Sequence, residues 1–169
     1  MQRDVRRSGV VSKAGWLRLA ARGSNTLTMV ASTVVRNSVV AQASTTAAAG
    51  GGISGAFSDV TLTSTILALN TAPGGPDCAI DMNSGGYNLI GKISGCSFAK
   101  KATDKVNVAN PRLGQLADNG GPARTVVLLT GSPALNVIPP SACKVTTDER
   151  GVHRPQGPRC DIGAYERKV

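Results

Sequence analysis

A pattern of alternating apolar and polar residues occurs twice in this chain, and the second copy follows the first after 33 positions. The copies cover residues 26–37 and 59–70, and with this offset Leu27 matches Val60. In each copy a strand of period two precedes a second short, β-branched strand and an Asn. The repeat therefore predicts successive turns of one winding chain.

A repeat of strand, corner, strand and corner is typical of a solenoid, because parallel strands need returns longer than a hairpin turn. Each coil would stack about 4.8 Å above the previous one, with Leu, Val and Ile inside. We expect Asn37 and Asn70 to adopt the left-handed conformation at the corners and to form a ladder. A β-sandwich is the alternative, but the Asn at the same phase in both copies favours the solenoid.

Composition favours the same all-β class. Aromatic residues make up only 3% of the 169 residues, so Val, Leu, Ile and Ala must build the core, and 20 Gly and 9 Pro indicate many turns.

Later segments are less regular. We expect a glycine turn and short strand at 47–53, a turn cluster at 73–78, a strand at 84–91, a polar loop at 100–110, and short strands within 110–116, 125–129 and 131–135.

The four cysteines form two pairs that are close in sequence, Cys78 with Cys96 and Cys143 with Cys160. Four cysteines allow three connectivities. The local one closes two short loops, and each bridge would stabilise the fold by about 3 kcal/mol. No spacing typical of zinc ligands is present, so disulfides, and with them an oxidising compartment, are favoured over a metal.

The net charge of +9 is unevenly distributed. Residues 1–23 carry +5, residues 24–99 carry −1 and residues 100–169 carry +5. A nucleic-acid-binding protein would gather its positive charge on one face beside stacking aromatics, whereas here the basic residues are interleaved with acids and turns. We therefore expect no nucleic-acid partner.

Residues 1–23 do not resemble the rest of the chain. They could form a weak basic helix over residues 14–21, but we expect a disordered or non-native leader. Lys13, Arg18 and Arg22 interrupt any apolar run of signal-peptide length, and no stretch approaches the roughly 20 apolar residues of a membrane span. Disulfides without an export signal indicate a fragment, or a mis-started frame, of a longer exported protein.

Several blocks occur together in an order typical of one family. They are residues 75–78, 86–91 and Cys96, then 113–122, 131–134, 148–155 and 160–166. In this order the chain resembles the C-terminal region of bacterial right-handed parallel β-helix surface proteins, called choice-of-anchor Q or polymorphic outer membrane protein-like. The resemblance covers about residues 24–166. It implies an exported β-helix whose last coils are closed by a cap, on the bacterial surface or outside the cell, although no anchoring segment follows here.

The β-helix is also the scaffold of polysaccharide lyases and hydrolases, which need clustered carboxylates. The acids between residues 24 and 99 are Asp59, Asp77 and Asp81, and we interpret them as turn and strand-entry residues. No catalytic triad order, phosphate-binding loop or metal-ligand spacing is present. We therefore expect no catalytic residues, cofactor or metal, and keep a carbohydrate-active fragment as the alternative.

The tail combines mixed charges with turn formers, a composition that excludes a helix or central strand. We expect five charged residues to seal the end of the solenoid through paired charges and hydrogen bonds, while His153 is an exposed turn residue. These cap residues are Asp148, Arg150, Arg154, Asp161 and Glu166.

The predicted organisation is a leader (1–23), coils with irregular later turns (24–142) and a disulfide-braced cap (143–169). The expected role is structural or adhesive, with an unknown carbohydrate or protein ligand. Because a truncated solenoid exposes a coil, we also expect self-association through the N-terminal coil.

Overall fold

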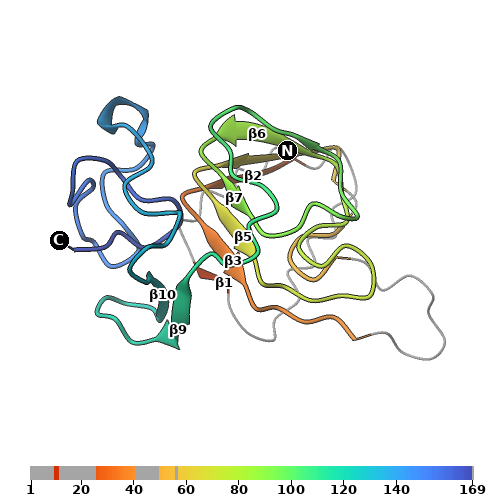
Figure 1. Cartoon of the computed structure of the whole chain (residues 1–169), viewed down its shortest axis with the longest axis horizontal. Coiled ribbons are helices and arrows are strands. Elements are labelled where there is room, and N and C mark those ends of the chain that lie inside the picture. The colour runs from red at the N-terminus through yellow and green to blue at the C-terminus, as the bar shows by residue number, and fades with distance from the viewer. Residues whose placement is uncertain (1–9, 12–25, 41–49, 56, 169) are drawn as a thin grey trace.

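The computed structural model describes residues 10–11, 26–40, 50–55 and 57–168 (Figure 1). These residues form β-strands and one short 3-10 helix, η1 (Pro140–Ala142), and none of them lies in an α-helix. The all-β class expected from the sequence is therefore confirmed.

Eight strands build two parallel four-stranded sheets. The first sheet contains β1 (Val10–Val11), β3 (Thr33–Val35), β5 (Ile66–Ala68) and β7 (Leu89–Ile90). The second contains β2 (Thr26–Val30), β4 (Asp59–Thr63), β6 (Met82–Gly86) and β8 (Phe98–Ala99). Consecutive strands alternate between the sheets, and the first sheet's strands lie side by side in chain order (Figure 1).

The strand register follows the repeat in the sequence. Leu27 pairs with Val60 and Met29 pairs with Leu62, so the offset of 33 residues between β2 and β4 is confirmed. The next step along the second sheet is shorter, because Thr61 pairs with Asn83. The repeat becomes less regular after residue 73 because the return between parallel strands is shorter there. The parallel pairing itself continues.

A third row of contacts joins residues 50–53 to residues 74–77. Four successive amides, from Gly50 to Ile53, donate hydrogen bonds to carbonyls of the later segment over 2.9–3.3 Å. A Cβ on Gly52 would lie 2.3 Å from the Asp77 carbonyl oxygen, so glycine permits this approach. The expected glycine turn and turn cluster therefore run alongside each other.

The corner geometry differs from the prediction at one position. The left-handed residues are Arg36 (φ 57°) and Leu69 (φ 60°), each one residue before the corner Asn. The Asn residues do form the expected ladder, in which the Nδ2 of Asn37 donates to the Oδ1 of Asn70 over 2.9 Å. The turn at the preceding residue directs the Asn amide toward the neighbouring strands, where it satisfies backbone groups.

The first sheet is covered on both faces. Val34, Leu67 and Ile90 pack into one apolar cluster with residues of the second sheet. Their neighbours Val35, Ile66 and Leu89 belong to a different cluster, which includes Ile138 and Ile162 of the C-terminal region. Because side chains alternate along a strand, the C-terminal region must cover the outer face of this sheet.

An antiparallel hairpin follows the parallel sheets. It contains β9 (Leu113–Ala117) and β10 (Thr125–Leu128), as the expected strands in this region suggested. Residues 131–135, in contrast, form turns, so the strand expected there is wrong. Pro133 lacks an amide hydrogen to donate and lies within this turn, next to Ser132, whose Oγ accepts from the Ala134 amide.

Two further expectations concern less regular segments. Most of the predicted leader, including the helix at 14–21, lies outside the described residues, but Val10–Val11 pair with β3 as β1. The loop expected at 100–110 contains one element of sheet structure, a parallel bridge between Lys105 and Leu89. Both corrections come from pairing with distant strands, which local composition does not encode.

Candidate functional site in the C-terminal segment

The C-terminal segment, residues 143–168, packs against the outer face of the first sheet. The Gly163 amide donates to the Ser64 carbonyl over 2.9 Å, and the Ala164 amide donates to Thr33 Oγ1 over 3.0 Å. Thr33 begins β3, and Ser64 directly follows β4. These contacts are lateral to the strands, whereas the sequence analysis expected a position at an end of the stack.

Asp148 is the most heavily bonded of the five predicted cap residues. Its Oδ1 accepts from the Arg150 and Val152 amides, and its Oδ2 accepts from the Glu166 amide and two guanidinium nitrogens of Arg150 at 2.7 and 3.0 Å. Burial alone would raise the pKa of Asp148, but these hydrogen bonds outweigh burial and hold the pKa below its usual value. Asp148 is therefore held as a carboxylate.

Arg150 connects this carboxylate to two other segments. Its Nη1 donates to the Asn119 carbonyl over 3.3 Å, and its Nη2 donates to the Glu166 carbonyl over 2.5 Å. The guanidinium also lies 3.7 Å from the centre of the Tyr165 ring. Arg150 thus joins the hairpin turn to the end of the chain through groups that a lysine could not contact together.

Glu166, Asp161 and Arg154 form the second half of the network. Glu166 accepts the amides of Gln156 and Asp161, and its Oε2 lies 3.5 Å from Arg154 Nη1. Arg154 donates to the Asp161 carbonyl over 3.0 Å and to the Gly163 carbonyl over 2.6 Å. The charged side chains therefore fix the backbone of residues 161–163, which contacts the sheet through Gly163.

Burial changes the ionisation of this second half. It raises the pKa of both Asp161 and Glu166, although hydrogen bonds from backbone amides and the charge of Arg154 act in the opposite direction. Burial also lowers the pKa of Arg154. The oxygens of the three carboxylates face backbone amides and guanidinium groups, all from the same segment except the amide of Asn136, so the network is suited to bracing loops.

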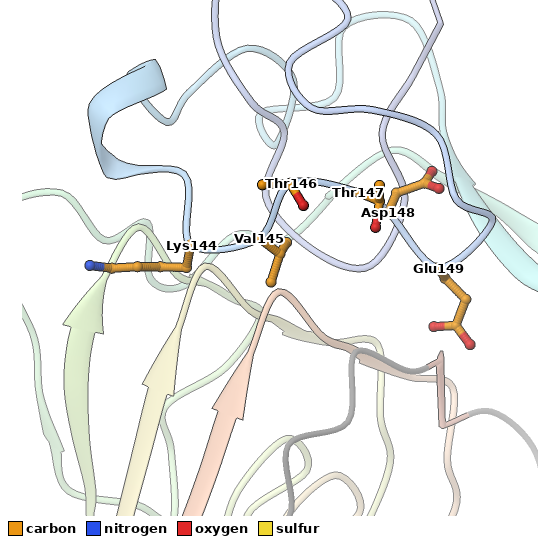
Figure 2. Close-up of a pocket in the computed structure, with 6 residues that line it drawn as sticks. All are labelled: Lys144, Val145, Thr146, Thr147, Asp148 and Glu149. Atoms are coloured by element: carbon orange, nitrogen blue, oxygen red, sulfur yellow. The ribbon is translucent and has the colours of Figure 1, made fainter.

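The segment also borders a shallow depression of about 500 Å³. It is lined by Lys144, Val145, Thr146, Thr147, Asp148 and Glu149. Figure 2 shows Lys144 and Glu149 at opposite ends of this run, with side chains that point away from each other. Asp148 is already bonded to Arg150, and the side chains of Lys144 and Glu149 point apart. The depression therefore does not bring together two charged side chains for binding a ligand.

Both disulfides have the local pairing. Cys78 is bonded to Cys96, and Cys143 is bonded to Cys160. The first joins the third row of contacts to the following loop, and the second joins the end of η1 to Cys160, which forms an isolated bridge with Ile138. Two such bridges are typical of proteins that fold in an oxidising compartment.

The other acids considered in the sequence lie apart from this network. Asp77 is buried, and its Oδ1 and Oδ2 accept the amides of Asn70 and Lys92 over 3.0 and 2.7 Å. Asp59 accepts from Asn83, and Asp81 is exposed. In the described ranges there is no group of three His, Cys, Asp or Glu residues placed to hold a metal ion. His153 is exposed, and its carbonyl accepts from Gln156.

Sequence reasoning missed a second ladder at the opposite corner. Thr65 Oγ1 accepts the Ser32 amide at 3.4 Å, Asn88 Oδ1 accepts the Thr65 amide at 3.0 Å, and Asp104 Oδ1 accepts the Asn88 amide at 2.8 Å. Four different residue types occupy the four positions of this ladder, and the number of residues between successive positions decreases along the chain. A search for a repeated Asn therefore could not find it.

No family model, curated protein or solved structure matches this chain. Within the part of the chain that the structure describes, there is also no helix of the length and apolar character needed to cross a membrane.

Proposed function

We propose that this chain is a non-catalytic, structural segment of an exported bacterial cell-surface protein, built as a right-handed parallel β-helix. The observation that carries the proposal is the alternation of successive parallel strands between two sheets, with a register of 33 residues at the first step. This is the arrangement expected when one chain winds around an apolar centre. The resemblance to the choice-of-anchor Q group supplies the bacterial surface as the location.

The two disulfides support an extracytoplasmic location, because cytosolic thiols are kept reduced. The C-terminal network supports a structural role. Its carboxylates are occupied by backbone amides and guanidinium groups, and the segment contacts both Thr33 in β3 and Ser64 next to β4. A brace of this kind holds coils in register, which is what an extended surface scaffold requires.

The test has two parts, because the proposal claims both a location and the lack of catalysis. Antibodies against the purified chain should label intact cells of the organism that produces it, and brief protease treatment of those cells should remove the label. The purified chain should release no reducing ends or unsaturated products from polysaccharides such as pectin. Labelling only after cell lysis would disprove the location. Turnover that is lost in Asp77→Asn or Asp81→Asn would show instead a carbohydrate-active protein.

A further inference from the structure

Three arginines approach one another where four segments meet at the open end of the β9–β10 hairpin. Arg36 Nη2 donates to the Leu113 carbonyl over 3.0 Å. Arg112 Nη1 donates to the Thr130 carbonyl over 3.3 Å, and Arg167 Nη2 donates to Thr130 Oγ1 over 3.0 Å. Two guanidinium groups therefore converge on a single residue, and a third binds the residue next to Arg112.

These arginines differ from the arginines of the buried network in their partners. Arg150 and Arg154 each have a carboxylate within ion-pair distance, at 2.7 and 3.5 Å. The guanidinium groups of Arg112 and Arg167 donate hydrogen bonds to neutral oxygens in the described structure, and the charge of Arg167 acts to lower the pKa of Asp161. The nearby carboxylate of Asp161 instead accepts the amides of Asn136 and Arg167. Adjacent cations repel one another, and an anion bound between them would remove that repulsion.

The donors that remain could bind such an anion. Arg112 is exposed and Arg167 is half-buried, and each uses one terminal nitrogen on Thr130. The other nitrogens of both planar groups have no hydrogen-bond partner in the described structure. A guanidinium offers paired N–H groups whose geometry matches the two oxygens of a carboxylate.

We propose that Arg112 and Arg167 form a binding site for the carboxylates of an acidic polysaccharide. The inference rests on the proposed function, since it supplies a ligand class for a chain placed at the cell surface. A polymer with a charge on each sugar can place neighbouring carboxylates on the two arginines at once. A single small anion bound between the arginines would lack the second carboxylate.

A nucleic acid fits the site less well, because proteins that bind single strands combine positive charge with aromatic side chains that stack on bases. The aromatic residues of the described structure are engaged elsewhere. Tyr165 lies beneath Arg150, Phe57 and Phe98 pack against the core between the sheets, and Tyr87 packs against the cluster on the outer face. The surface around Thr130 therefore offers charge without stacking.

The experiment is a calorimetric titration of the full chain with short polygalacturonate at low ionic strength. We expect the double variant Arg112→Gln/Arg167→Gln to bind at least about tenfold more weakly, since the charge-assisted hydrogen bonds from both guanidinium groups are lost. The matched control is the double variant Arg124→Gln/Arg159→Gln, which removes the same two positive charges from exposed arginines outside the site. The control should bind within about twofold of the unchanged chain. Equal weakening by the control would overturn the site.

Additional ligands and variants separate this site from general electrostatic attraction. Arg112→Lys keeps the charge but loses the planar donor pair, so we expect binding between that of the unchanged chain and the double variant; full retention would contradict the geometry. Neutral dextran should not bind, and dextran sulfate should bind more weakly than polygalacturonate. Equal binding of single-stranded DNA, lost in the same double variant, would replace the polysaccharide with a nucleic acid.

The result can be separated from that of the proposed function. If intact cells are labelled but no acidic polysaccharide binds, the arginine site is disproved while the surface role remains. If polygalacturonate is bound through Arg112 and Arg167 but also cleaved, the site is supported and the non-catalytic role is wrong. Unchanged melting of each variant, followed by circular dichroism, shows that lost binding does not come from unfolding.

Discussion

At the scale of single residues, Gly163 is where the C-terminal segment approaches the sheet most closely. Its φ is +98°, and an added Cβ would lie 2.7 Å from both Ile66 Cδ1 and Thr33 Oγ1. We expect Gly163→Ala to lower the free energy of unfolding by about 2–4 kcal/mol, from backbone strain and crowding together. Urea unfolding followed by circular dichroism measures this value.

Gly151→Ala is the matched control for that substitution. Gly151 has a similar φ of +82°, but an added Cβ would have no atom within 4 Å. This variant reports the backbone cost alone, about 1 kcal/mol. If the two variants lose equal stability, the segment is not packed as tightly against Thr33 and Ile66 as the distances indicate.

The stabilisation that Asp148 contributes to the fold depends on pH, and the direction of this dependence follows from its pKa. Its folded pKa lies below its unfolded value of about 3.9, so its stabilisation is present above pH 4 and is lost as the pH falls through the folded pKa. We expect Asp148→Asn to cost about 2–4 kcal/mol at pH 7, because Arg150 loses its buried partner. Urea unfolding at several pH values should show the difference from the unchanged chain shrinking below pH 4. A difference that stays constant down to pH 2 would contradict the assignment.

Asp161 and Glu166 act with the opposite sign, because their folded pKa values are raised. Their contribution is most favourable below the unfolded values of about 4 and becomes less favourable as the pH rises through the folded values. The pH experiment on Asp148 should therefore compare each variant with the unchanged chain at the same pH, which cancels this shared background.

At the scale of strands and corners, the ladders hold successive parallel strands in register. Asn88 is fully buried, its Oδ1 accepts the Thr65 amide, and its Nδ2 donates to Leu62, Ser84 and Asp104. Removing this amide takes away the acceptor of the Thr65 amide and a donor to the Leu62 carbonyl, both in buried residues. The corner is therefore a polar joint that only a side chain with both donors and an acceptor can fill.

We expect Asn88→Ala to lower the free energy of unfolding by about 2–4 kcal/mol, since each buried group left without a partner costs about 1–3 kcal/mol. Asn83→Ala is the control, because Asn83 is exposed and donates only to Asp59. That change should cost less than about 1 kcal/mol. Urea unfolding of both variants decides the point, and equal losses would mean that the ladder does not stabilise the strands.

The sequence predicted these corner ladders only where the repeat was regular. The offset between Leu27 and Val60 and the contact of Asn37 with Asn70 followed from one spacing. The corner of Asn88 did not, because shorter returns shift the spacing and because Ser, Thr, Asn and Asp fill equivalent steps. A ladder specifies hydrogen-bonding capacity, which several residue types share, and so leaves a weak signal in one sequence.

At the scale of the whole molecule, one sheet joins the two apolar clusters. Val34 packs toward the second sheet, while the adjacent Val35 packs toward the C-terminal region. The sequence identified the charged residues and disulfides of that region but not its lateral position. The contact between Ala164 and Thr33 spans 131 residues, and no local pattern encodes a pairing over that distance.

Because the clusters share this sheet, loss of the bridge between Cys143 and Cys160 should affect strands that the bridge does not touch. We expect Cys143→Ser/Cys160→Ser to destabilise the fold by about 3 kcal/mol, from the greater freedom of the unfolded loop. Hydrogen exchange measured by mass spectrometry should then show faster exchange both in the C-terminal segment and in β5, whose Ile66 packs against it. Faster exchange confined to residues 143–168 would show that this segment opens alone, and that the sheet holds its strands together without it.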